Sequence, residues 1–250
     1  MRFSNFPLFT TIASLAMASL CVAQPQSPQS FEVASIRPNR SGATDSNVDS
    51  TAGGRLTITN ENVKALIILA FGVKDYQISD APGWLDSERY DIAAKTATPA
   101  NPGLETEKSL LRALLADRFA LQSHKETRES TVYSLQIGKN GSKLTRHDDG
   151  SGTTARTTCG HMTGKRVTVA VLATMLSLQL EHDVADQTAL PGKYDFQLDW
   201  TPDTGPCRDE QIDHPSIFTA VQEQLGLKLE SAKGPTEILV IDHIDRPSEN

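Results

Sequence analysis

The sequence lacks an excess of positive charge: its 250 residues include 24 Lys and Arg against 31 Asp and Glu, a formal net charge of −7. A general nucleic-acid-binding protein needs a basic surface that neutralises phosphates, and an anionic membrane surface attracts the same charge. The charge balance therefore argues against both kinds of partner. With 38% hydrophobic and 22% charged residues, the composition is that of an ordinary globular protein.

The motifs of catalysis and cofactor binding are also missing. The sequence contains no G-x-S-x-G, phosphate-binding P-loop, G-x-G-x-x-G or EF-hand pattern. Its histidines and cysteines show none of the H-x-x-x-H or C-x-x-C spacings that bind zinc. We therefore predict no catalytic residues, no cofactor and no metal ligands.

Residues 1–23 have the pattern of a secretory signal peptide. Arg2 supplies the positive charge, the stretch 8–22 is apolar, and small residues precede a cleavage site after Ala23. We predict export to the periplasm or the extracellular space. A membrane anchor is the alternative, but the stretch is too short and too rich in Ser and Thr to span comfortably. A lipoprotein acylated at Cys21 is a second alternative, which the bulky Leu20 disfavours.

Signal removal leaves two cysteines, Cys159 and Cys207, which lie 48 positions apart. In an exported chain this pair predicts a disulfide, and two unpaired thiols are the alternative. Closing a loop of this length would stabilise the fold by roughly 4 kcal/mol in the chain-entropy model. The spacing is not C-x-x-C, which argues against a catalytic disulfide.

Hydrophobic periodicity predicts an α+β fold built from short elements. In the first half the expected strands are residues 31–36, 55–59, 76–78, 90–94, 120–124 and 131–137, with helices over 63–71 and 106–115. In the second half the expected strands are 163–167, a short one from 184, 194–200, 227–230 and 237–244, with helices over 169–180 and 215–225. The segment 24–30 is a Pro/Gln/Ser spacer, and 38–54 and 96–103 are expected to be loops.

The two halves of the sequence match each other at a nearly constant offset. Tyr90-Asp91 matches Tyr194-Asp195, 104 positions on, and Leu135 matches Ile241, 106 positions on. We therefore predict two similar α-β-β-α-β-β units with helices packed on one face of small mixed or antiparallel sheets. The units are 31–137 and 161–246, joined by a polar linker at 138–160 and followed by a tail at 247–250. The alternative is one sheet shared by both halves, in which the strand closing the first unit pairs with a strand of the second.

Three stretches carry a resemblance to a known family: 31–39 (FEVASIRPN), 81–95 with 110–129, and the C-terminal run 190–250. Together they resemble the uncharacterised secreted "soil-associated" proteins of acidobacteria, which occur alone or as the tail of a membrane metallopeptidase similar to the β-lactam sensor. This sequence has no H-E-x-x-H and resembles the stand-alone form. That family has no established activity. Residues 169–244 also resemble the STN domain of secretins and TonB-dependent transducers, which implies a small interaction module of the cell envelope.

Several residues are candidates for a site, each with a structural alternative. Glu181, His182 and Asp183 could bind a metal or transfer protons, although a solvated helix end explains them better. Trp84 and Trp200 could stack on a sugar or peptide, but such aromatics usually belong to the core. The acidic loop 201–214, with Asp203, Asp209, Glu210 and Asp213, has no calcium-binding spacing and is interpreted as a solvated loop.

Asp91 and Asp195 occupy equivalent places in the two repeats, which indicates a structural role because a catalytic residue is usually needed once. Taken together, the sequence favours an exported, non-enzymatic binding module that works through protein contacts, with sheet edges open to strand addition. The alternative is a secreted, hydrolase-like enzyme with a site in the cleft between the repeats. A structural protein without a specific ligand is the third hypothesis.

Overall fold

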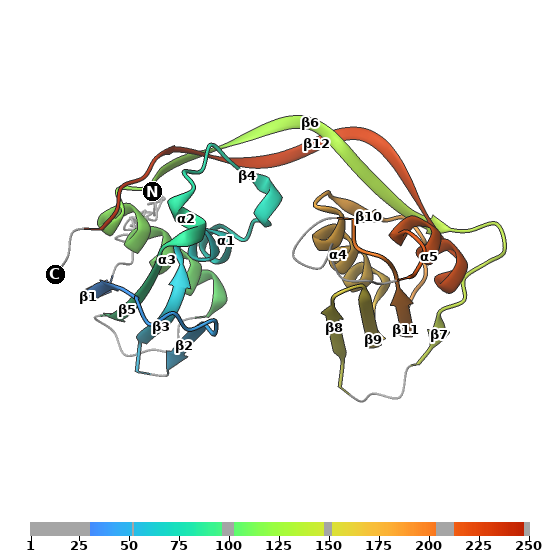
Figure 1. The fold of residues 1–250 in the computed structure, drawn as a ribbon, viewed down its shortest axis with the longest axis horizontal. Helices are drawn as coiled ribbons and strands as arrows, with labels where there is room; N and C mark the ends of the chain where they lie inside the picture. The colour runs from blue at the N-terminus through green and yellow to red at the C-terminus, as the bar shows by residue number, and fades with distance from the viewer. Residues whose placement is uncertain (1–30, 52, 97–102, 148–151, 204–212, 248–250) are drawn as a thin grey trace, which may run out of the picture.

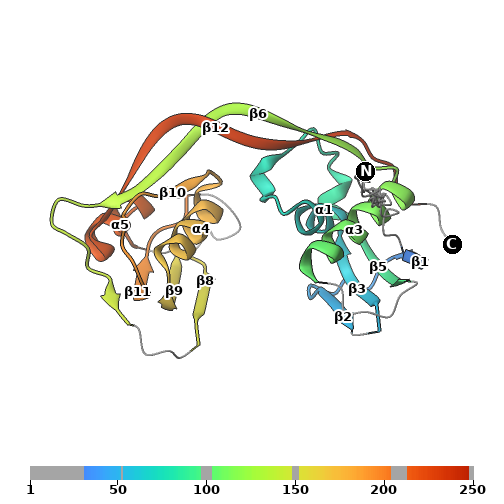
Figure 2. The ribbon, with the colours of Figure 1, turned by 180° about the vertical axis from the view of Figure 1, so that it is seen from behind.

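The chain folds into two lobes joined by a long two-stranded ribbon, and a view from behind shows the same arrangement (Figures 1 and 2). The computed structural model describes residues 31–51, 53–96, 103–147, 152–203 and 213–247. The predicted signal peptide, its cleavage site after Ala23 and the spacer at 24–30 lie outside these residues. Within these ranges, five α-helices, one 3-10 helix and several small sheets, antiparallel or mixed, confirm the α+β class. No helix in the described part of the chain is long and apolar enough to cross a membrane.

Lobe 1 is built from the elements that come first in the chain. These are β1 (Phe31–Pro38), β2 (Asn47–Thr51), β3 (Arg55–Asn62), α1 (Val63–Phe71), the 3-10 helix η1 (Asp75–Gln77), β4 (Ile78–Ser79), α2 (Trp84–Ser87), β5 (Arg89–Thr96) and α3 (Leu104–Arg118). The side chain of Asn62 accepts a hydrogen bond from the N–H of Ala65 and so caps α1, and Gly72 ends this helix at φ +66°. Both ends of the helix agree with the sequence.

Lobe 2 repeats the order of the strands and of helices α1 and α3, without counterparts of η1 and α2 among the described residues. It contains β7 (Thr145–Arg146), β8 (Thr154–Thr158), β9 (His161–Val167), α4 (Val169–Leu180), β10 (Val184–Asp186), β11 (Tyr194–Asp199) and α5 (Ile217–Leu225). The sheet of lobe 1 has the order β1-β5-β3-β2, and the sheet of lobe 2 has the order β7-β11-β9-β8. Each strand of one sheet therefore has a counterpart at the same place in the other, as a duplicated unit requires.

The ribbon consists of β6 (Gln122–Ile137) and β12 (Leu227–His243), which pair antiparallel from Gln122 opposite His243 to Ile137 opposite Leu227. Each strand begins in its own lobe and ends in the other. There β6 pairs with β10 and β12 pairs with β4, both parallel, so the third sheet has the order β10-β6-β12-β4. The shared sheet posed as the alternative thus exists alongside the separate sheet of each lobe.

This exchange corrects part of the sequence prediction. The strands expected at 120–124 and 131–137 are one continuous strand, and so are those expected at 227–230 and 237–244. Residues 125–130 and 231–236 are mostly exposed, but their backbone groups pair across the ribbon. The expected linker at 138–160 contains β7 and β8 of lobe 2, and the expected loop at 38–54 contains β2. The connection between the lobes is the ribbon itself.

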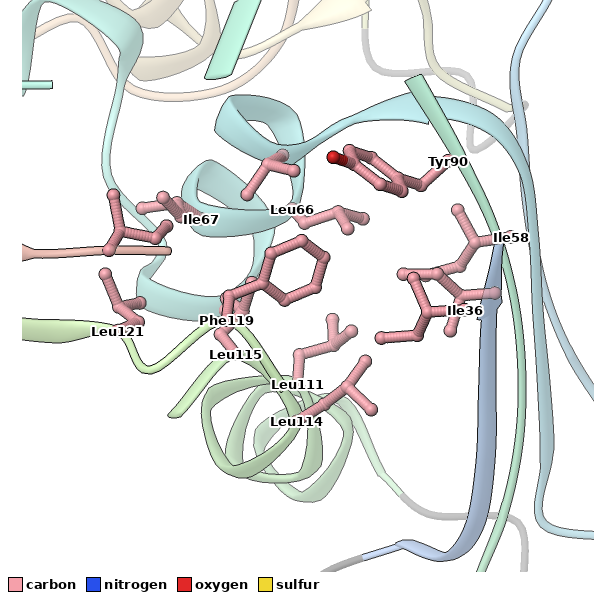
Figure 3. Close-up of a cluster of buried hydrophobic side chains, with 14 of the residues drawn as sticks. Ile36, Ile58, Leu66, Ile67, Tyr90, Leu111, Leu114, Leu115, Phe119 and Leu121 are labelled. Atoms are coloured by element: carbon pink, nitrogen blue, oxygen red, sulfur yellow. The ribbon is translucent and has the colours of Figure 1, made fainter. Parts of the chain in front are cut away.

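The core of lobe 1 lies between its sheet and helices α1 and α3 (Figure 3). Phe119 is fully buried at the end of α3 and meets the ring of Tyr90 edge-on, with 5.6 Å between ring centroids. Ile36 and Ile58 face these rings from the sheet. Ile241, near the end of β12, belongs to this core although it is far along the chain.

The core of lobe 2, like that of lobe 1, is formed by a sheet and two helices. Helix α4 contributes Leu172 and Leu176, α5 contributes Val221, and β11 contributes Leu198. Leu135, near the end of β6, completes this core and has no exposed surface. Leu135 and Ile241 are equivalent at the offset of 106. The first half of the sequence thus supplies a buried side chain to the core of lobe 2, and the second half supplies the equivalent side chain to the core of lobe 1.

Candidate functional site

In each lobe, the strand at one edge of the sheet is exposed. Among the described strands β2 pairs only with β3, and β8 occupies the equivalent place beside β9. All five residues of each strand are exposed. A strand at a sheet edge carries backbone N–H and C=O groups that another extended chain can pair with. Charged side chains, bulges or a covering element protect many natural edges. The sequence predicts neither strand, because residues exposed on both faces show no alternation of polar and apolar types.

The lobes differ in the length of their equivalent last helices, α3 in lobe 1 and α5 in lobe 2. When the two helices are matched at their C-terminal ends, α3 with 15 residues extends about two turns further at its N-terminus than α5 with nine. These extra turns begin at Leu104, and their residues Leu104 and Glu107 line one cavity together with residues of β2. A feature that only one copy has is a better candidate for function than a feature that both share.

A cavity of about 280 Å³ lies beneath the extra turns of α3. Its lining is mainly apolar and includes Phe31, Val48, Leu56, Leu69, Leu104, Leu110 and Leu111. Two of these side chains are unusually exposed for their type: Leu104 at 60% and Val48, on the edge strand, at 41%. Ser50, two positions along β2, donates a hydrogen bond of 2.8 Å to Glu107 of α3 and so ties the edge strand to the helix. The cavity therefore opens beside an unpaired strand edge.

Asp91 and Asp195 hold equivalent backbone turns in the two lobes. The carboxylate of Asp91 accepts hydrogen bonds from the N–H of Asn60, at 2.9 Å, and from the side-chain amide of Asn39, at 2.8 Å. Asp195 accepts one from the N–H of Arg166, at 2.7 Å, and meets the Nδ1 of His147 at 3.0 Å. Asn60 and Arg166 both have φ of +55°, a left-handed conformation that an accepted hydrogen bond helps to hold. This supports the structural interpretation of the two aspartates.

The replacement Asp91→Ala is expected to lower the free energy of unfolding by about 1–3 kcal/mol, because it leaves the N–H of Asn60 and the amide of Asn39 without an acceptor. Asn60 is 2% exposed, so water cannot readily replace the carboxylate. Urea denaturation checks the value. Asp91→Asn keeps one acceptor oxygen and should lose less. Equal losses in the two variants would show that charge, and not hydrogen bonding, is what Asp91 supplies.

The structure does not bring Glu181, His182 and Asp183 together as a site. Glu181 ends α4 in a left-handed conformation, and the ring of His182 stacks on Tyr133 with 5.7 Å between centroids. No three His, Cys, Asp or Glu side chains within the described ranges gather where they could hold a metal ion. Glu181 is the residue at which α4 ends, as the interpretation of a helix end predicts.

Asp183 connects the two lobes. Its Oδ1 accepts a hydrogen bond of 2.8 Å from the hydroxyl of Tyr76 and forms an ion pair of 3.1 Å with Lys74, both from lobe 1. Burial opposes ionisation of Asp183, but the hydrogen bonds from Tyr76 and Lys74 outweigh it and lower the pKa of this carboxyl. Burial, together with the bond to Asp183, raises the pKa of Tyr76. These side chains form a fixed contact between the lobes.

The remaining candidates lie apart from one another. Trp200 is 3% exposed and belongs to the lobe 2 core, whereas Trp84 is partly buried against the lobe 1 core with the guanidinium of Arg246 5.1 Å above its ring. Asp203 and Asp213 border the acidic loop; Asp209 and Glu210 lie outside the described residues. Cys159 lies in the turn between β8 and β9, but Cys207 also lies outside them, so the disulfide stays a prediction.

The fold and its edge site define an α+β protein of two similar, strand-exchanged lobes. The chain belongs to the family described as "Protein of unknown function (DUF3738)", which it matches over residues 64–244. The match begins inside α1 of lobe 1, at Lys64, and includes the whole ribbon and all of lobe 2. No curated protein and no solved structure matches the chain.

Proposed function

We propose that this protein is an exported, non-enzymatic binding module that holds an extended peptide segment of another protein against β2. The observation that carries the proposal is the fully exposed edge strand β2, which lies beside an apolar cavity that the extra turns of α3 help to line. The signal-peptide pattern supports export, and the resemblance of residues 169–244 to the envelope STN domain supports a role in protein contacts.

The geometry fits recognition by strand addition. In this mode, main-chain hydrogen bonds to the sheet edge give affinity, and a pocket for alternate side chains gives specificity. Val48 and Ser50 are two positions apart, so they lie on one face of β2, and both line the cavity. An added strand would place every second side chain on that same face. A bulky apolar side chain of the peptide would then enter the cavity between β2 and Leu104.

Polar groups at the rim would orient the bound segment. Glu107 is held by Ser50, and Lys108 pairs with Glu105 at 2.8 Å, so the helix presents fixed charges of both signs. Arg55 lies at the start of β3 on the same rim. No observation on the described residues favours the alternative of a secreted hydrolase, and we do not propose one.

A test is to select seven-residue peptides that bind the mature protein from a displayed library and to measure the affinity of the best one. We expect enrichment of one bulky apolar residue among strand-forming neighbours. Leu104→Glu should weaken binding at least about tenfold, because it places a charge in the apolar cavity. Since Leu104 is 60% exposed, this variant should fold normally.

The matched control is Leu178→Glu, which changes a leucine that is 54% exposed on α4 of lobe 2. It should leave the affinity unchanged. Methylating alternate backbone nitrogens of the peptide should abolish binding, because strand addition depends on those donors. Equal losses in the two glutamate variants, or full binding of the methylated peptide, would contradict the proposal.

A further inference from the structure

A second and quite different cavity lies at the opposite end of the lobe 1 sheet. It has a volume of about 870 Å³, and its lining, which mixes polar and apolar residues, includes Arg40, Arg89 and Arg246. These arginines come from the loop after β1, the start of β5 and the segment after β12. Residues far apart in the sequence therefore converge on one cleft, in a protein whose net charge is −7.

Hydrogen bonds fix the loop that carries Arg40. The side-chain amide of Asn60 donates to the carbonyls of Ala43 and Asp45, both at 2.8 Å. The side-chain oxygen of Asn39 accepts from the N–H of Ser41 at 2.9 Å. Since Asn60 is buried and is itself held by Asp91, the wall of the cleft is formed before any ligand arrives.

The charges in the cleft are only partly neutralised. Arg246 pairs with Glu88 at 2.7 Å, and the hydrogen bond from Arg246 lowers the pKa of Glu88 despite the opposing effect of burial. Arg89 donates to a neutral group, the carbonyl of Asn60, at 2.8 Å. Within the described residues, neither Arg89 nor Arg40 has a carboxylate partner. Arg40 and Arg89 both line the cleft, and each guanidinium can offer five N–H groups, of which the described contacts use only the one from Arg89 to Asn60.

We propose that this cleft binds a small ligand with two or more negative charges on carboxylate or phosphate groups. Planar guanidinium groups bind both kinds of oxyanion through paired N–H donors, which makes arginine the side chain best suited to them. Arg40 and Arg89 would contact the ligand, and the Arg246–Glu88 pair would form the wall behind it. The site is separate from the peptide edge and would give the protein a second binding activity.

Isothermal titration calorimetry on the full mature protein tests this at low ionic strength, with citrate, inorganic phosphate and uncharged sorbitol as probes. We expect citrate or phosphate to bind and sorbitol not to bind. Arg40→Ala should weaken binding about tenfold, the loss of a charge-assisted hydrogen bond, and Arg89→Ala should do the same. The matched control is Arg156→Ala, which removes an exposed arginine from β8 of lobe 2 and should leave the affinity unchanged.

Arg40 is exposed and contributes no hydrogen bond to the fold among those described, so Arg40→Ala tests the proposal even if Arg89→Ala proves unstable. Tighter binding of citrate would assign carboxylates as the ligand groups, and tighter binding of phosphate would assign phosphate. Absence of binding by both anions, or equal losses in Arg40→Ala and Arg156→Ala, would overturn the proposal. Leu104→Glu should retain anion binding, so failure of the peptide site would not be mistaken for failure of this one.

Discussion

Leu135→Ala is expected to destabilise lobe 2, and Ile241→Ala is expected to destabilise lobe 1, each by about 2–5 kcal/mol. In each case the affected lobe is made mostly from the other half of the sequence. Leu135 has no exposed surface and Ile241 is 5% exposed, so both truncations leave cavities in packed cores. The two residues are equivalent across the duplication, which makes each variant the matched control of the other.

Urea denaturation gives the total loss, and hydrogen exchange with mass spectrometry shows where the protein opens. Leu135→Ala should raise exchange most in α4 and α5, which pack on it, and Ile241→Ala should raise it most in α1 and α3. The reverse pattern, with each substitution loosening the helices of its own sequence half, would contradict the strand exchange. Trp84 and Trp200 provide one fluorescence probe in each lobe.

The strand exchange also explains where sequence reasoning succeeded and where it failed. In elements with one buried face, apolar residues recur in the sequence with the period of the helix or strand. Such elements, for example α4 over Val169–Leu180 and β11 from Tyr194, were predicted closely. The middle of the ribbon is exposed on both faces and shows no such period. Its strands are specified by pairing with a partner more than a hundred residues away, and a local pattern contains no information about that partner.

The two candidate sites were missed for a related reason. Val48 lies in a polar, exposed strand that resembles a loop in sequence. Leu104 is the first residue of α3 but lies before the helix predicted at 106–115, which already had an apolar face. Arg40, Arg89 and Arg246 are isolated in the sequence, and only the closing of the sheet and the return of β12 bring them together. By contrast, the equivalence of Asp91 and Asp195 was visible, because a duplicated structural residue recurs at a fixed offset.

Reduction of a Cys159–Cys207 bridge is expected to lower the free energy of unfolding of the exported protein by roughly 4 kcal/mol, since the bridge closes a long loop in the unfolded chain. Cys159 lies between β8 and β9, while Cys207 follows β11 in the sequence. A bridge would thus link the turn between β8 and β9 to the segment of the sequence between β11 and α5. Lobe 2 should therefore lose most of the stability.

Urea denaturation followed by Trp200 fluorescence, with and without a phosphine reductant, measures this loss. Trp200 is buried in lobe 2, close in sequence to Cys207, and reports the lobe directly. The double variant Cys159→Ser, Cys207→Ser is the control: it should match the reduced protein and should not respond to reductant. Two titratable thiols in the exported protein before reduction would contradict the bridge, because oxidised Cys159 and Cys207 leave none once the signal peptide with Cys21 is removed.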